Sequence, residues 1–148
     1  MPESWTKTRF SSSLSGRRSR DTTPEILLRS ALHKAGLRFR VHRRIGGQLT
    51  ADIVLPRHRV AVYVDGCFWH GHGCRHGGGK VPSGPNADAW ATKFAKIKER
   101  EKRAKRFLQM NDYVVVRMWE CVVKTDPVAA AAEIVDIVRV RSALRGKV

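Results

Sequence analysis

Hydrophobic positions along the chain switch between helical and strand spacing, and this switching predicts the order of its elements. Near the N-terminus, Thr22 and Glu25 form a capping box around Pro24, and the apolar stripe that follows has helical spacing until Gly36. The stripe consists of Leu28, Ala31, Leu32 and Ala35. These positions predict a first helix that begins after Thr22 and ends at Gly36.

Three strands are expected next, because the spacing changes to alternation. Residues 37–44 alternate between apolar and basic side chains, residues 51–55 form a short apolar run, and residues 60–64 are β-branched or aromatic apart from one alanine. Only a tight connection over 56–58 joins the last two runs, so they should pair as an antiparallel hairpin. That pairing places Asp52 close to Asp65.

The C-terminal half is expected to contain two helices and one strand. Asp88 is placed to cap a long helix over residues 89–110, a strand follows over 113–119, and Pro127 opens a helix that ends near Leu144. The order α-β-β-β-α-β-α predicts an α/β fold with a mixed sheet flanked by helices. Residues 1–20 are predicted to be a flexible basic arm, and residues 21–148 a single domain.

The net charge of the chain indicates the class of molecule that it binds. The formal net charge is +16 and the isoelectric point is near 10.9, an excess that usually serves a polyanion, with nucleic acid as the first candidate. A ribosomal or chromatin-like packing protein would have the same charge. No apolar run reaches 18 residues and the N-terminus lacks a secretory signal. We expect a cytoplasmic protein, at the nucleoid in a bacterium.

A dense group of metal-binding residue types follows the strand at 60–64. Cys67, His72 and Cys74 lie within eight residues of one another, and Cys121 comes just after the last predicted strand. A Cys₃His set is a standard closed zinc shell, which predicts a structural zinc loop at the edge of the sheet. His70 and His76 compete for the single histidine position. The alternative is three free, buried thiols.

The acidic pair is the candidate for chemistry. Two carboxylates that converge from a hairpin suit Mg²⁺ beside a phosphate, so Asp52 and Asp65 predict metal-assisted phosphodiester hydrolysis. His70 would take a proton from the attacking water, and Glu25 would complete the site. Glu25 is also explained as a capping residue, and Asp65 by turn chemistry before a glycine. A nuclease and a zinc-stabilised binding module therefore both remain open.

Two further features suit nucleic acid. Phe68 and Trp69 are adjacent in a glycine-rich loop, where they either stack on bases or pack over the metal loop. The long predicted helix carries eight Lys or Arg against two Glu between Lys93 and Arg106. Within that surface, Lys93, Lys96 and Arg100 are the predicted DNA contacts.

Four motifs resemble one family. They are D-G-C-F-W-H-G-H-G-C, A-D-I-V-L, R-D-T-T-P-E and W-E-C. Together they resemble the very short patch repair endonucleases (Vsr), over nearly the whole chain from about Arg17 to the last helix. The resemblance implies a restriction-endonuclease-like fold with structural Zn²⁺ and catalytic Mg²⁺. It also implies nicking of DNA 5′ to the thymine of a T:G mismatch left by deamination of 5-methylcytosine.

The resemblance assigns roles to individual residues. Asp52 and the backbone carbonyl of Val64 would bind the catalytic metal, His70 would be the general base, and Glu25 with Asp65 would hold water. Cys67, His72, Cys74 and Cys121 match the zinc ligands. Phe68 and Trp69 match an aromatic wedge beside the mismatch, with Leu14 of the arm inserting from the other groove.

Some positions depart from the family pattern. Leu14 stands where the best-known members have Met, Asp65 where some have His, and Ile97 where an Asn is usual; the arm is also richer in serine. No departure removes a predicted metal or zinc ligand. The resemblance implies a monomer that acts on double-stranded DNA with a T:G mismatch, with mismatch-repair recruitment factors as further partners. Two alternatives stay open: a non-catalytic zinc-stabilised DNA-binding module, and a related nuclease with a different DNA target.

Overall fold

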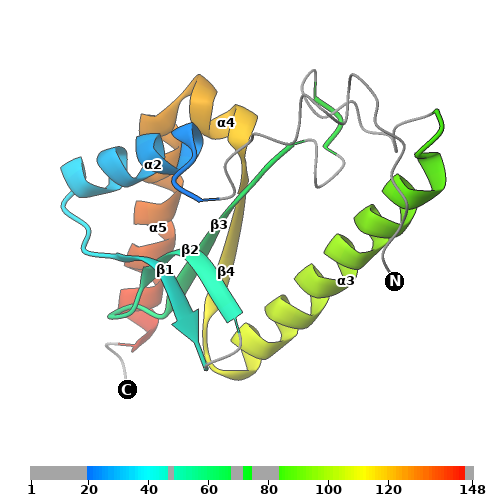
Figure 1. Cartoon of the computed structure of the whole chain (residues 1–148). Coiled ribbons are helices and arrows are strands. Elements are labelled where there is room, and N and C mark those ends of the chain that lie inside the picture. The colour runs from blue at the N-terminus through cyan, green and yellow to red at the C-terminus, as the bar shows by residue number, and fades with distance from the viewer. Residues whose placement is uncertain (1–19, 47–48, 68–71, 75–83, 146–148) are drawn as a thin grey trace.

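A mixed four-stranded sheet forms the centre of the computed structural model (Figure 1). The structure describes residues 20–46, 49–67, 72–74 and 84–145. The strands lie in the order β1-β2-β3-β4; β1, β2 and β3 pair antiparallel, and β3 and β4 pair parallel. Their bounds are Arg40–Ile45 for β1, Leu49–Leu55 for β2, Val60–Asp65 for β3 and Val114–Trp119 for β4. The predicted mixed α/β architecture is confirmed.

The predicted hairpin between β2 and β3 is also confirmed. Leu55 pairs with Val60 and Ile53 with Val62. The connection turns tightly, with the His58 N–H donating to the Leu55 carbonyl at 3.2 Å. Strand bounds differ from the prediction by one to three residues: β1 begins three residues later and ends one later, and β2 begins two residues earlier, at Leu49. In addition, β3 ends one residue later and β4 begins one residue later.

Four helices accompany the sheet in the described part of the chain. They are α2 at Thr23–Lys34, α3 at Ala87–Met110, α4 at Glu120–Thr125 and α5 at Pro127–Arg145. The start of α2 is as predicted, since the Thr22 N–H donates to Glu25 Oε2 at 3.4 Å. The predicted cap of α3 is wrong: Asn86 occupies that position and Asp88 lies in the first turn. The short helix α4 was not predicted.

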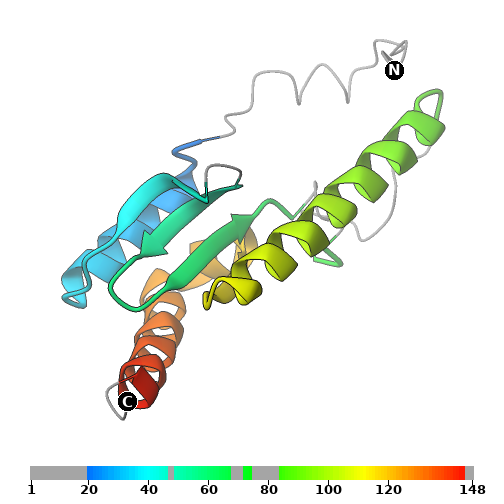
Figure 2. The same ribbon diagram turned by 90° about the horizontal axis from the view of Figure 1, so that it is seen from below.

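Each face of the sheet is covered by a different set of helices. Figures 1 and 2 show α2 and α5 on one side and α3 on the other. The larger core joins the sheet to α2, α4 and α5 through buried residues such as Leu28, Val123 and Ile134. The smaller core joins it to the C-terminal part of α3 through Leu108. The sheet is thus a middle layer between helices, and α3 contacts it mainly through its C-terminal end (Figure 2).

Before this anchored C-terminal end, α3 carries exposed basic side chains. Lys93, Lys96 and Arg100 are all exposed, as the DNA-contact prediction requires. None of the described helices is both long and apolar enough to cross a membrane. The division into an arm at 1–20 and one domain at 21–148 stays a prediction, because residues 1–19 lie outside the described ranges.

Replacing Leu108 with Ala should detach the end of α3 from the sheet. Leu108 is fully buried, and truncation of such a leucine costs about 2–5 kcal/mol. In a chain of this size each kcal/mol lowers the melting temperature by about 2–4 °C. Met110→Ala is the matched control, since Met110 is 83% exposed. Equal melting temperatures for the two variants would contradict this anchoring.

Candidate functional site

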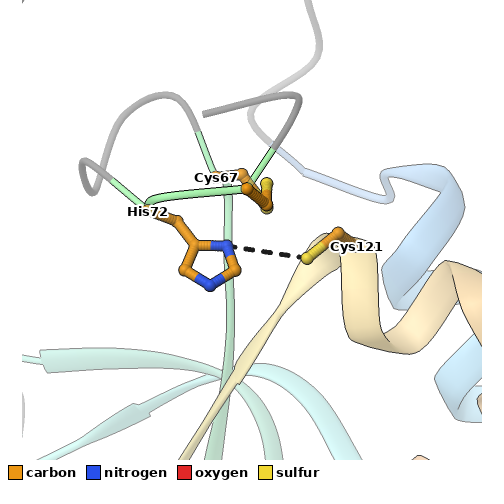
Figure 3. Close-up of side chains that lie close together, drawn as sticks. Cys67, His72 and Cys121 are labelled. Carbon is orange, nitrogen blue, oxygen red and sulfur yellow. Dashed lines mark hydrogen bonds between the residues drawn. The ribbon is translucent and has the colours of Figure 1, made fainter. Parts of the chain in front are cut away.

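Three cysteines and one histidine converge beyond the ends of β3 and β4. Cys67 follows β3, His72 and Cys74 lie further along the same loop, and Cys121 lies in the first turn of α4. One ligand atom from each lies within 4.8 Å of all the others. Figure 3 shows the His72 ring directed at Cys121, with Nδ1 and Sγ 3.6 Å apart. The predicted set is therefore brought together.

Backbone and ring contacts hold this group in place. The Cys67 N–H donates to Glu120 Oε1 at 3.1 Å, and the His72 N–H donates to the Cys67 carbonyl at 2.9 Å. The His72 ring stacks on Trp119 with centroids 4.1 Å apart and planes within 9°. Because Trp119 and Glu120 stand at the junction of β4 and α4, the W-E-C motif orients the loop as well as supplying Cys121.

The cluster fits a tetrahedral cation. Zn–S bonds of about 2.3 Å and Zn–N bonds of about 2.0 Å place neighbouring tetrahedral ligands roughly 3.5–3.8 Å apart, and the His72–Cys121 separation is 3.6 Å. Burial, together with the neighbouring thiols of Cys121 and Cys74, raises the pKa of Cys67 to about 12. At neutral pH, this thiol would ionise only beside a compensating positive charge, which a bound cation supplies.

Asp52 lies where β2 and β3 separate. The regular pairs end at Ile53 and Val62, and beyond them Asp52 Oδ2 accepts the Val64 N–H at 2.9 Å. Burial raises the pKa of Asp52 above its usual value, and the nearby Asp65 carboxylate adds to the rise. The Val64 N–H and His42 oppose it. Because Asp52 binds the N–H of Val64, the residue before Asp65, it lies close to Asp65 as the hairpin predicts.

Asp65 is buried and paired. Arg117 of β4 donates to Asp65 Oδ1 at 2.9 Å, and the same guanidinium lies 4.4 Å from the centre of the Tyr63 ring. Tyr63 and Arg117 are direct partners in the parallel ladder, so the register itself sets this contact. The positive charge of Arg117 also lowers the pKa of Asp52, although burial outweighs it. Sequence reasoning missed Arg117, whose only signal was a charge inside an apolar strand.

Glu25 reaches the same region from α2. Its side chain is only 4% exposed, and Oε2 accepts from Arg29 at 3.2 Å and lies 3.8 Å from His42 Nε2. Burial raises the pKa of Glu25, and repulsion from Asp52 raises it further. In addition to its capping contact, the Glu25 carboxylate thus bonds to Arg29 and lies beside His42.

Asp21, Arg29 and His42 were not singled out from the sequence. Asp21, Glu25 and His42 meet closely enough to suggest a second metal group. However, Arg29 donates to Asp21 at 2.8 Å and to Glu25, so a guanidinium already provides positive charge there. The only available signal for Arg29 was its spacing of four residues from Glu25, which is common on helix surfaces.

Several predicted site residues lie outside the described ranges. These are His70, Phe68, Trp69 and Leu14, together with His76, the alternative ligand. Their roles as general base, aromatic wedge, arm wedge and ligand stay predictions. Val64 is described, and its N–H is bound by Asp52, but its carbonyl as a metal contact likewise stays a prediction.

The sequence of this chain is similar to a family model and to several known proteins. A family model described as DNA mismatch endonuclease Vsr matches residues 3–76, half of the 148 residues. A relative from Xanthomonas oryzae, type II nicking enzyme V.XorIIP, is 42% identical over 70% of this chain and 74% of its own length. Type II nicking enzyme V.NmeAIP from Neisseria meningitidis is 36% identical over 72% of this chain and 73% of its own.

A third relative is itself named as a mismatch endonuclease. The DNA mismatch endonuclease Vsr of Escherichia coli is 36% identical over 72% of this chain and 65% of its own length. From the family match and these relatives, the chain belongs to the Vsr family of DNA mismatch endonucleases.

Proposed function

We propose that this chain is a Mg²⁺-dependent endonuclease that nicks DNA 5′ to the thymine of T:G mismatches arising from deamination of 5-methylcytosine. The observation that carries the proposal is the convergence of Glu25 and Asp65 on Asp52, where β2 and β3 separate. Like-charged carboxylates gathered in a partly buried corner are unfavourable unless a cation or a substrate group uses them. Membership of the family supplies the class of target.

Asp52 and the Val64 carbonyl are the proposed ligands of Mg²⁺. The donor set fits, because hard cations take carboxylate and carbonyl oxygens and Asp52 is already oriented by the Val64 N–H. When bound, the ion would supply Lewis-acid stabilisation of the charge that develops on the phosphodiester. Glu25 and Asp65 would orient water, and His70 would take its proton as the oxygen attacks phosphorus; the P–O bond to one deoxyribose oxygen would break, and that oxygen would leave and take a proton from solvent.

The remaining predicted contacts recognise the duplex. Lys93, Lys96 and Arg100 are exposed on α3 and suit backbone phosphates, which position a protein without reading sequence. Phe68, Trp69 and Leu14 are the proposed wedges at the mismatch.

Four wider properties belong to the same proposal. The sheet is proposed to be of the restriction-endonuclease type. The Cys₃His cluster is proposed to hold structural Zn²⁺. The chain is proposed to work as a monomer at the nucleoid, and mismatch-repair recruitment factors are proposed as further partners.

Strand-resolved cleavage of labelled duplexes tests the chemistry and the target together. With Mg²⁺, nicking of the T strand in a T:G duplex but not in a T:A duplex is expected across a set of flanking sequences. Asp52→Ala should lower the rate about a thousand-fold or more, since metal stabilisation is worth several kcal/mol and each 1.36 kcal/mol is tenfold. DNA affinity should persist.

Other outcomes would redirect the proposal. Equal cutting of T:G and T:A duplexes would keep the nuclease but remove mismatch specificity. Tight binding without cutting under any flank would favour the non-catalytic zinc-stabilised binding module instead.

Asp52→Asn should stabilise the protein in the absence of Mg²⁺ while removing cleavage. Burial raises the pKa of Asp52 in the folded state above its ordinary 3.8, so the folded protein binds more protons than the unfolded chain just above that pH. Stability is then fully present below pH 3.8 and is lost as pH rises through the raised pKa. The asparagine keeps the acceptor for Val64 without the charge.

Melting curves between pH 4 and 8 without Mg²⁺ measure this effect. The variant should melt higher than the wild type at neutral pH, and the difference should shrink toward pH 4. A variant that melts lower at neutral pH would show that the carboxylate is stabilising, contrary to its environment. Asp136→Asn is the matched control, since that carboxylate is exposed on α5.

Removal of a cluster cysteine tests the proposed zinc site. Wild-type protein should contain one zinc per chain, and Cys121→Ser should lose it and be less stable by about 3 kcal/mol or more, the linkage expected for a ligand well above its dissociation constant. Val122→Ala is the control, because Val122 is 45% exposed in the same helix. Metal analysis and melting curves measure both effects. Unchanged stability and no zinc in the wild type would restore the interpretation of free buried thiols.

A further inference from the structure

A polar network centred on Arg29 surrounds the carboxylate of Glu25. The Arg29 guanidinium lies 2.8 Å from Asp21 Oδ1, 3.2 Å from Glu25 Oε2 and 2.9 Å from His42 Nε2. Its members come from the segment before α2, from α2 itself and from β1. The side chains of Arg29 and His42 are largely buried, at 18% and 6% exposure. Residues distant in the sequence therefore converge on one face of Glu25.

Two members of this network have unusual backbone conformations. Asp21 has φ +52° and His42 has φ +47°, in the left-handed region that residues other than glycine rarely adopt. For His42 this occurs inside a strand whose pairing is regular on both sides, at Val41 with Ile53 and at Arg43 with Ala51. That register sets His42 opposite Asp52. Arg59 and Asp112 also have positive φ, but they lie in turns, so His42 is the one such residue inside a strand among the described residues. Strain held inside regular pairing is typical of functional sites.

The network is also incompletely satisfied. Arg29 Nε is buried and has no hydrogen-bond partner in the described part of the chain. His42 Nε2 lies 2.9 Å from a donor on Arg29 and 3.1 Å from an acceptor on Asp21, and one ring nitrogen can bond to only one of them at a time. A cluster that served folding alone would be expected to satisfy its buried donors.

The contacts are selective between the two oxygens of Glu25. Among the described residues, the hydrogen bonds and ion pairs of this carboxylate, from the Thr22 N–H, Arg29 and His42, all use Oε2. Oε1 takes part in none of them. The two hydrogen bonds to Oε2, from Thr22 and Arg29, restrict the rotation of the carboxylate and so the direction of Oε1, while His42 lies 3.8 Å from Oε2.

We propose that Arg29 and His42 are positioning residues: Arg29 binds Oε2 of Glu25, and His42 contacts the Arg29 guanidinium, so that Oε1 is directed to the reacting water and metal beside Asp52. This inference rests on the proposed nuclease function. It gives a functional reason for the strained backbone of His42 in β1, because pairing in the sheet does not require that conformation. It also separates Glu25 from a simple capping residue, which would need only the Thr22 N–H.

A double-mutant cycle on the full-length, zinc-loaded protein tests the inference. Arg29→Gln and His42→Asn should each slow single-turnover cleavage about 10–100-fold, the usual cost of losing a group that orients a metal-site residue. In a Glu25→Gln background, Arg29→Gln should add less than about twofold, because it acts through Glu25. Arg29→Lys should recover part of the rate. Arg139→Gln, at an exposed ion pair of α5, should leave the rate unchanged.

A readout independent of cleavage accompanies the cycle. Mg²⁺ should raise the melting temperature of the wild type more than that of Arg29→Gln, while the affinity for mismatched DNA without Mg²⁺ should agree within about twofold. Additive rate losses in the cycle, or equal losses of rate and affinity, would overturn the inference. A fully active Glu25→Gln variant would overturn it too, by leaving Glu25 as a cap.

Failure of the proposed function gives a different pattern. If the wild type cuts no duplex, the difference in Mg²⁺-induced melting shift between wild type and Arg29→Gln still decides the positioning role: equal shifts overturn it, and a smaller shift in the variant supports it. If Arg29→Gln does not fold, Arg29→Lys carries the same comparison, because it keeps the charge and loses the planar fork.

Discussion

The gathering of three carboxylates, two buried and one partly buried, at one end of the sheet is the constraint on which the site depends. Glu25, Asp52 and Asp65 come from different elements, and burial together with a neighbouring carboxylate raises the pKa of both Glu25 and Asp52. The fold offsets this with an arginine on each flank, Arg29 beside Glu25 and Arg117 beside Asp65. Asp52, between them, receives only a backbone N–H and more distant positive charge. It is therefore the carboxylate that most needs a cation.

Sheet topology explains why these groups meet. The antiparallel hairpin brings Asp52 to the end of β3, and parallel pairing of β3 with β4 brings Arg117 alongside. The same parallel pairing sends both strands out at one edge, where Cys67 and Cys121 face each other. One edge of the sheet thus holds the acidic corner and the sulfur cluster, and helices on both faces bury the strands behind it.

Local patterns predicted much of this arrangement. The hairpin, the start of α2 and the convergence of the Cys₃His set followed from turn chemistry, a capping box and ligand spacing, which are encoded within a few residues. The helix α4 was missed because its six residues contain no full apolar repeat. His42 and Arg117 were missed for another reason: their roles arise from strand register and, for His42, from a left-handed backbone, and neither can be recognised from local spacing. Arg29 was missed because a spacing of four residues from Glu25 is common on helix surfaces.

The cluster of thiols makes the site sensitive to oxidants. Cys67 lies two residues beyond Asp65, and Cys121 two residues beyond Trp119, the ladder partner of Asp65. With three sulfurs within 4.8 Å, any oxidant that displaces a bound cation finds pairs already close enough to move into a disulfide. Such a bond would pull on the ends of both strands that carry the acidic corner. Oxidation of this cluster would therefore also disturb the carboxylates of the candidate active site.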